Sequence, residues 1–101
     1  MKIVFDKGPP SFDGNASAVR FLVRVDGQPV ECAVSSAALQ DHMGADTPME
    51  QDVLAAFEKG RREIESICRD ALELNGGEPM TITSGQLRME KLTRRAADAS
   101  Q

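Results

Sequence analysis

Two valine-rich runs flank the dipeptide Asp26-Gly27, and this arrangement predicts a β-hairpin. Both central residues of a type I′ turn need a positive φ, which aspartate and glycine tolerate. A two-residue loop also fixes the register, so Phe21 faces Cys32 across the two strands. In that register one face of the hairpin consists of Val19, Phe21, Val23, Val25, Val30, Cys32 and Val34. This face is expected to be buried in the core.

The opposite face of the hairpin mixes charge with apolar residues: Arg20, Leu22, Arg24, Pro29, Glu31 and Ala33. Two arginines on the same face of one strand can bind a phosphate or a carboxylate together, so Arg20 and Arg24 are candidate ligand-binding residues. Leu22 lies across from Glu31, diagonal to both arginines, so neutralisation across the strands is an equal alternative. A leucine on this face also indicates a covered surface, and a subunit contact is the third alternative.

Two helices are predicted after the hairpin. Ser35-Ser36 caps a short helix, residues 37–43, which Gly44 ends. Thr47-Pro48-Met49-Glu50 has the pattern of a capping box, and a long amphipathic helix follows, residues 49–74. At ~1.5 Å per residue this helix is nearly 40 Å long. Either it bends near Gly60 or one end projects beyond the sheet.

The remaining segments complete a small α+β domain. Residues 2–5 and 79–83 are predicted strands, and residues 11–17 a polar loop. The predicted fold is a small antiparallel sheet packed on one long and one short helix, because the sheet and the helices each have one apolar face. Residues 1–85 form this single domain. Residues 86–101 form a charged tail that is either a marginal helix or disordered.

The charge is uneven along the 101 residues. The whole chain has a formal charge of −4, but residues 87–101 carry four basic and two acidic residues. The acidic residues before this tail disfavour nucleic acid as a partner. Because the tail is basic, a regulator that associates with nucleic acid remains an alternative. No apolar run approaches the ~20 residues that cross a membrane, and no secretory signal is evident. These features predict a cytoplasmic protein with reduced thiols.

Cys32 and His42 are the candidates for a reactive thiol and its base. The alternative is that Cys32 is a small apolar core residue and that His42 lies in the last turn of the short helix, beside the negative end of its dipole. Asp41 is adjacent to His42, but neighbouring helix residues point apart. Cys32, Cys68 and His42 lack the close pairs of a zinc site, so neither a metal nor a cofactor is predicted.

Several short motifs follow one another in a recognisable order: residues 2–5, Val19-Arg20-Phe21, Val25-Asp26-Gly27, Val30-Glu31-Cys32, Ser35, residues 38–42, Phe57, Arg62-Glu63-Ile64-Glu65 and the closing strand. Over residues 1–84 this order resembles a known group of small bacterial proteins, domain-of-unknown-function family 1488. It implies an α+β fold with a hairpin and helices. It implies no catalytic or binding residue, because the family has no assigned role.

The sequence favours a non-enzymatic interaction protein over an enzyme. Leu22 on the outer face of the hairpin and the length of the helix predict a homodimer that forms through one of these two surfaces. A binder of small anions and a regulator associated with nucleic acid are the alternatives from other classes.

Overall fold

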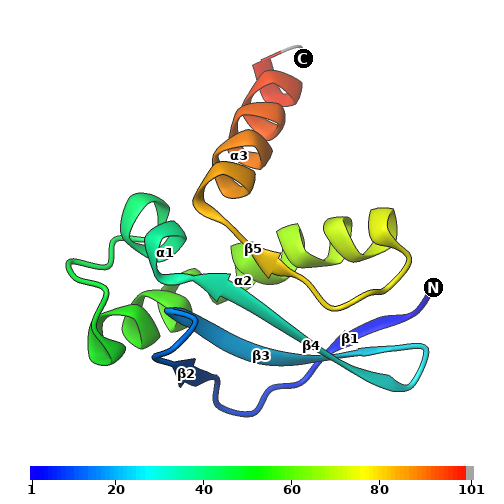
Figure 1. The fold of residues 1–101 in the computed structure, drawn as a ribbon. Helices are drawn as coiled ribbons and strands as arrows, with labels where there is room; N and C mark the ends of the chain where they lie inside the picture. Colours follow the sequence, from blue (N-terminus) through cyan, green and yellow to red (C-terminus); the bar gives the residue numbers. More distant parts are fainter. Residues whose placement is uncertain (100–101) are drawn as a thin grey trace.

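The computed structural model describes residues 1–99, which form five strands and three helices. The elements in chain order are β1 (Ile3–Phe5), β2 (Ser11–Asp13), β3 (Ala18–Val25), β4 (Gln28–Ser35), α1 (Ser36–His42), α2 (Glu50–Asn75), β5 (Thr81–Ile82) and α3 (Ser84–Ala99). The predicted α+β class is confirmed: α2 packs across one face of a small sheet, and α1 lies at the end of β4 (Figure 1).

The predicted hairpin is confirmed residue by residue. Phe21 pairs with Cys32 and Val25 with Gln28 in the antiparallel ladder of β3 and β4. Asp26 and Gly27 have φ angles of 51° and 84°, the positive pair that a type I′ turn requires. Every residue of the predicted apolar face is buried.

The sheet has the order β1-β3-β4-β5, and β2 joins β3 on the same edge as β1. β1 pairs with the end of β3, and β2 with its beginning. The expected polar loop at residues 11–17 therefore contains a strand, because Phe12 lies opposite Val19 and adds to the core face. The sheet is antiparallel apart from β5, which runs parallel to β4.

The start of α1 agrees with the sequence. Ser35 is the N-cap, and its Oγ accepts a hydrogen bond from the backbone N–H of Ala38 at 3.1 Å. Gly44 follows the helix with a φ of 82°, in the left-handed region that glycine tolerates.

The predicted cap of α2 is wrong in detail. The N-cap is Met49, and Thr47 instead accepts a bond from the N–H of Met49 and donates one to Asp52. The threonine stabilises the turn before the helix, because the N-cap lies two residues after the predicted Thr47. Gly76 ends α2 with a φ of 80°.

α2 is one continuous helix of 26 residues, and Gly60 lies inside it without interrupting it. Gly60 has a packing role: a Cβ placed there would lie 2.6 Å from the Sδ of Met43, a residue just after α1. Met49 and Leu74, near the two ends of α2, are 69% and 86% exposed. Val53 and Leu72, within one turn of the two ends, are fully buried, so the helix contacts the core along nearly its whole length.

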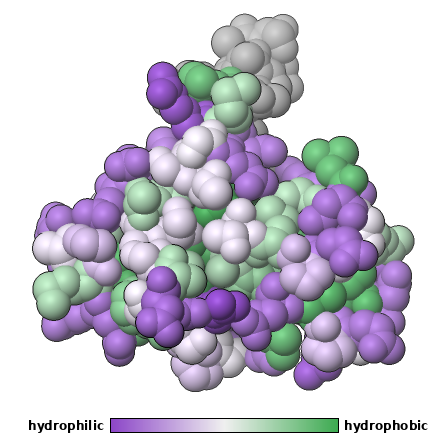
Figure 2. Space-filling model, in the orientation of Figure 1, coloured by the Kyte–Doolittle hydropathy of each residue, from purple (hydrophilic) through white to green (hydrophobic). Residues whose placement is uncertain are grey.

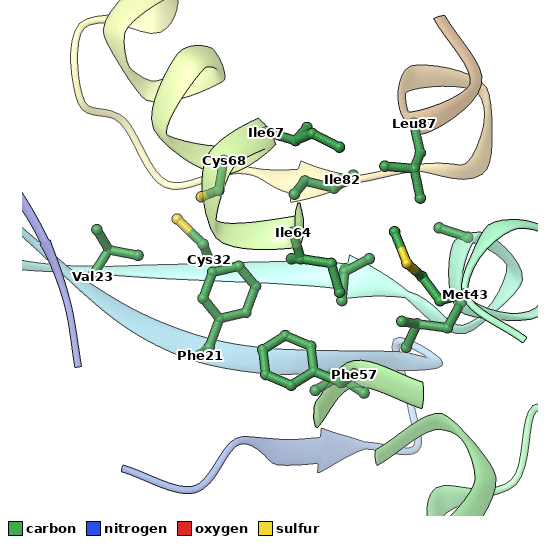
Figure 3. Close-up of a cluster of buried hydrophobic side chains, with 14 of the residues drawn as sticks. Phe21, Val23, Cys32, Met43, Phe57, Ile64, Ile67, Cys68, Ile82 and Leu87 are labelled. Carbon is green, nitrogen blue, oxygen red and sulfur yellow. The ribbon is translucent and has the colours of Figure 1, made fainter. Parts of the chain in front are cut away.

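The core lies between α2 and the sheet (Figure 3). The rings of Phe21 on β3 and Phe57 on α2 lie 5.3 Å apart between centroids, a tilted aromatic contact. Ile64, Ile67 and Ile82 are fully buried beside them. Burial of a large apolar side chain stabilises the fold by roughly 1.5–3 kcal/mol, so this layer holds α2 on the sheet.

The predicted tail, residues 86–101, belongs to α3, which begins at Ser84 and is helical to Ala99. The last two residues lie outside the described part of the chain. Leu87, in the first turn of α3, is fully buried and joins the core. Beyond it α3 extends away from the sheet (Figure 1), and Met89 and Leu92 are exposed.

Candidate functional site

The outer face of the sheet, on the side opposite α2, combines charge with apolar surface. Arg24 and Glu31 are exposed there, Leu22 is half-buried, and Val4 of β1 lies opposite Arg24 with 47% of its surface exposed. Figure 2, in the orientation of Figure 1, shows strongly hydrophilic residues interspersed with weakly polar and apolar ones. The helices pack their apolar residues against the other face of the sheet. Within residues 1–99, no helix therefore covers the outer face.

Arg20 on this face is held by two carboxylates. Its guanidinium forms ion pairs with Asp13 of β2, at 2.6 Å, and with Glu31 of β4. The hydrogen bond from Arg20, together with the backbone N–H of Ala16, holds the pKa of Asp13 below its ordinary value of 3.8. Neutralisation across the strands, one of the alternatives for the two arginines, is therefore present at Arg20.

The two candidate anion-binding arginines differ in their surroundings. An anion at Arg20 would have to displace Asp13 or Glu31, whereas Arg24 forms no ion pair with a described residue. A shallow hollow of about 160 Å³ adjoins Arg20, between Pro9, Ser11 and Leu22. Anion binding by Arg20 and Arg24 stays a prediction.

Cys32 and Cys68 face each other in the core. Cys32 lies on β4 and Cys68 on α2, both are free thiols, and their sulfur atoms point toward one another (Figure 3). The hydrogen bond to Cys32 and burial both raise the pKa of Cys68. The same hydrogen bond lowers the pKa of Cys32. Cys68 thus has the character of a buried structural thiol, and a reactive role for Cys32 stays a prediction.

His42 lies at a different junction, between α1 and α3. Its Nε2 is 3.2 Å from the carbonyl oxygen of Ser84, and the hydroxyl of Ser84 donates to the carboxylate of Asp41. Asp41 and His42 thus both contact the first residue of α3. Cys32 contacts Cys68, whereas His42 contacts Ser84. Their role as a reactive dyad stays a prediction.

Sequence reasoning missed the contacts of Ser84, since 43 residues separate it from Asp41 and no local motif connects them. It also gave Arg61 no individual role. Arg61 donates to the backbone of the loop between β1 and β2, and only the tertiary structure reveals those acceptors.

Two further properties concern metals and membranes. Across residues 1–99, no group of three His, Cys, Asp or Glu side chains is placed to hold a metal ion. None of the helices in the same range is long and apolar enough to span a membrane.

Comparison with known proteins identifies a family but no activity. Residues 3–83 match the family model described as "Protein of unknown function (DUF1488)". A crystal structure of a DUF1488 protein of unknown function from Shewanella loihica PV-4 is similar in fold, with a TM-score of 0.68 and 21% sequence identity. The similarity covers 77% of this chain and 89% of that one. No curated protein matches. The matched region runs from β1 to the end of β5, and on this evidence the chain belongs to the DUF1488 family.

Proposed function

We propose that this protein is a non-enzymatic interaction protein that pairs with a second copy of itself through the outer face of its sheet. The supporting observation is the apolar surface of that face, where Leu22 of β3 and Val4 of the edge strand β1 lie among charged residues. Apolar side chains in the middle of a polar rim are the usual composition of a protein interface.

The charges on this face suit a second copy. A two-fold dimer brings the same patch of both subunits together, so the patch must be complementary to itself. Arg24 has no ion-pair partner among the described residues, and 59% of the Glu31 side chain is exposed. A two-fold axis near Leu22 allows Arg24 of each copy to meet Glu31 of the other.

The proposed setting is the cytoplasm of a bacterium. Two unpaired, buried cysteines fit a reducing compartment, where thiols stay reduced. The pairing is proposed to organise other proteins rather than to perform chemistry.

Sedimentation equilibrium over a wide range of concentrations tests the dimer. The wild-type protein is expected to associate, and Leu22→Asp to be monomeric, because it places an unpaired charge in the contact. Leu74→Asp is the matched control, since Leu74 is an exposed leucine on the long helix. Circular dichroism checks that both variants are folded.

A charge exchange gives the sharper result. Arg24→Glu and Glu31→Arg are each expected to weaken association, and the double variant to recover part of it, because the attraction is restored with opposite signs. A monomer at every concentration overturns the proposal. If Leu74→Asp loses the dimer and Leu22→Asp keeps it, the copies meet through α2, and this result also contradicts the proposal.

A further inference from the structure

A hollow lies between α2 and the loop that joins β1 to β2. It encloses about 390 Å³, against about 160 Å³ for the hollow beside Arg20. Its lining, called here the basic hollow, consists entirely of charged residues: Lys7, Glu58, Lys59, Arg61, Arg62 and Glu65. Four cations and two carboxylates give it a formal charge of +2, although the whole chain carries −4.

Arg61 forms the fixed floor of the basic hollow. Its guanidinium donates to Glu58 at 3.2 Å, to Glu65 at 3.1 Å and to the carbonyl oxygens of Asp6 and Gly8. Only 16% of this side chain is exposed. Both carboxylates of the lining therefore hold Arg61, and Glu65 also contacts Lys7, whereas neither forms an ion pair with Lys59 or Arg62.

The remaining cations are available to a ligand. Lys59 and Arg62 form no ion pair with any described residue. Lys7 makes one long contact, 3.5 Å from Glu65, and 80% of its side chain is exposed. Lys59 and Arg62 are three residues apart on α2, a spacing that places them on the same side of the helix.

We propose that the basic hollow binds a small molecule that carries a phosphate or pyrophosphate group. A guanidinium supplies paired donors for phosphate oxygens, and the two ammonium groups add charge from two directions. Its volume lies at the lower end of the ~300–1,000 Å³ of ligand pockets, which leaves room for a phosphate group and a small organic part. This site is separate from the outer face of the sheet.

A phosphate group also occurs in nucleic acid, so the test must separate the two sources. The chain as a whole carries a formal charge of −4, which disfavours an extended polyanion, whereas a small ligand fits within the local positive field. A short single-stranded oligonucleotide therefore serves as the second probe beside sodium pyrophosphate.

The experiment is a titration of the full-length protein with pyrophosphate at low salt, followed by two-dimensional ¹⁵N–¹H NMR. The backbone signals of Lys7 and of residues 58–65 are expected to shift. The variant Lys59→Gln/Arg62→Gln is expected to lower the affinity about tenfold or more, because it removes two charge-assisted contacts. Lys2→Gln/Arg88→Gln is the matched control, since it removes equal charge from two exposed residues elsewhere.

The control variant is expected to change the affinity for pyrophosphate less than about twofold, because salt screens the effect of charges that lie far from the site. Three results overturn the proposal: no shift with pyrophosphate, shifts confined to other parts of the chain, or an equal loss of affinity in both double variants. Binding of the oligonucleotide with no binding of pyrophosphate also overturns it. None of these results depends on whether the protein dimerises.

Discussion

The Nη2 atom of Arg61 lies 2.8 Å from the carbonyl oxygen of Asp6, 55 residues away in the sequence. The same nitrogen also reaches Gly8, and the guanidinium lies over the ring of Phe57 at 5.4 Å from its centroid. One side chain of α2 therefore fixes the loop that connects the two edge strands. Arg61 is both a structural brace and the floor of the basic hollow.

Arg61→Lys is expected to destabilise the protein by about 2 kcal/mol. A lysine has donors on a single nitrogen, so it loses most of the bonds to Glu65 and to the two loop carbonyls; each bond to a charged group contributes roughly 1.5–3 kcal/mol. Arg62→Lys is the control and should cost almost nothing, because Arg62 has no such partners. Urea unfolding measures both, and equal midpoints for the two variants would contradict the role of Arg61.

The neighbouring serines Ser35 and Ser36 are expected to respond in opposite directions to alanine. Ser35 caps α1, so Ser35→Ala should cost about 1 kcal/mol. The hydroxyl of Ser36 is buried and has no hydrogen-bond partner in the described structure. Ser36→Ala should therefore stabilise the protein by up to about 1 kcal/mol, because it removes an unsatisfied polar group. Thermal unfolding of the two variants provides the comparison, and a shift in the same direction for both would refute it.

Cys32 and Cys68 are expected to react slowly with a thiol reagent in the native protein and rapidly in denaturant. Both side chains are buried, so labelling requires the core to open. The rate should therefore rise with urea in parallel with unfolding. Cys68→Ala isolates Cys32, and fast labelling of that variant without denaturant, with its far-UV spectrum unchanged, would favour a reactive thiol.

The ion pair of Asp13 with Arg20 predicts a loss of stability in acid. The pKa of Asp13 in the folded protein lies below its ordinary value of 3.8, so its contribution is complete above that value and is lost as the pH falls through the lowered pKa. Urea midpoints of wild type and Arg20→Gln should differ at about pH 5 and converge toward about pH 2. A difference that does not change with pH would show that the pair contributes nothing.

The hairpin was predictable because its determinants are local. Asp26-Gly27 sets the turn, the turn sets the register, and alternation then decides which residues face α2. The N-cap at Ser35 and the glycine after α2 are local signals of the same kind. Family membership was also accessible, since it depends on the order of such motifs.

The features that the sequence did not reveal depend on contacts between distant segments. β2 has one inward apolar residue, Phe12, and becomes a strand only by pairing with β3. The parallel direction of β5 follows from where α2 ends, which no short motif encodes. For the basic hollow, the charges on α2 were visible as a polar helix face, but the carbonyl acceptors that hold Arg61 in place were not.

The division of one sheet edge between β1 and β2 has a consequence for how this protein can assemble. An added strand needs an uninterrupted row of free backbone donors and acceptors, and β3 offers none because two short strands already occupy its outer side. On the other side, β5 is only two residues long. The sheet is therefore protected against growth into fibrils by strand addition at either border, so the proposed pairing of two copies has to depend on side-chain contacts.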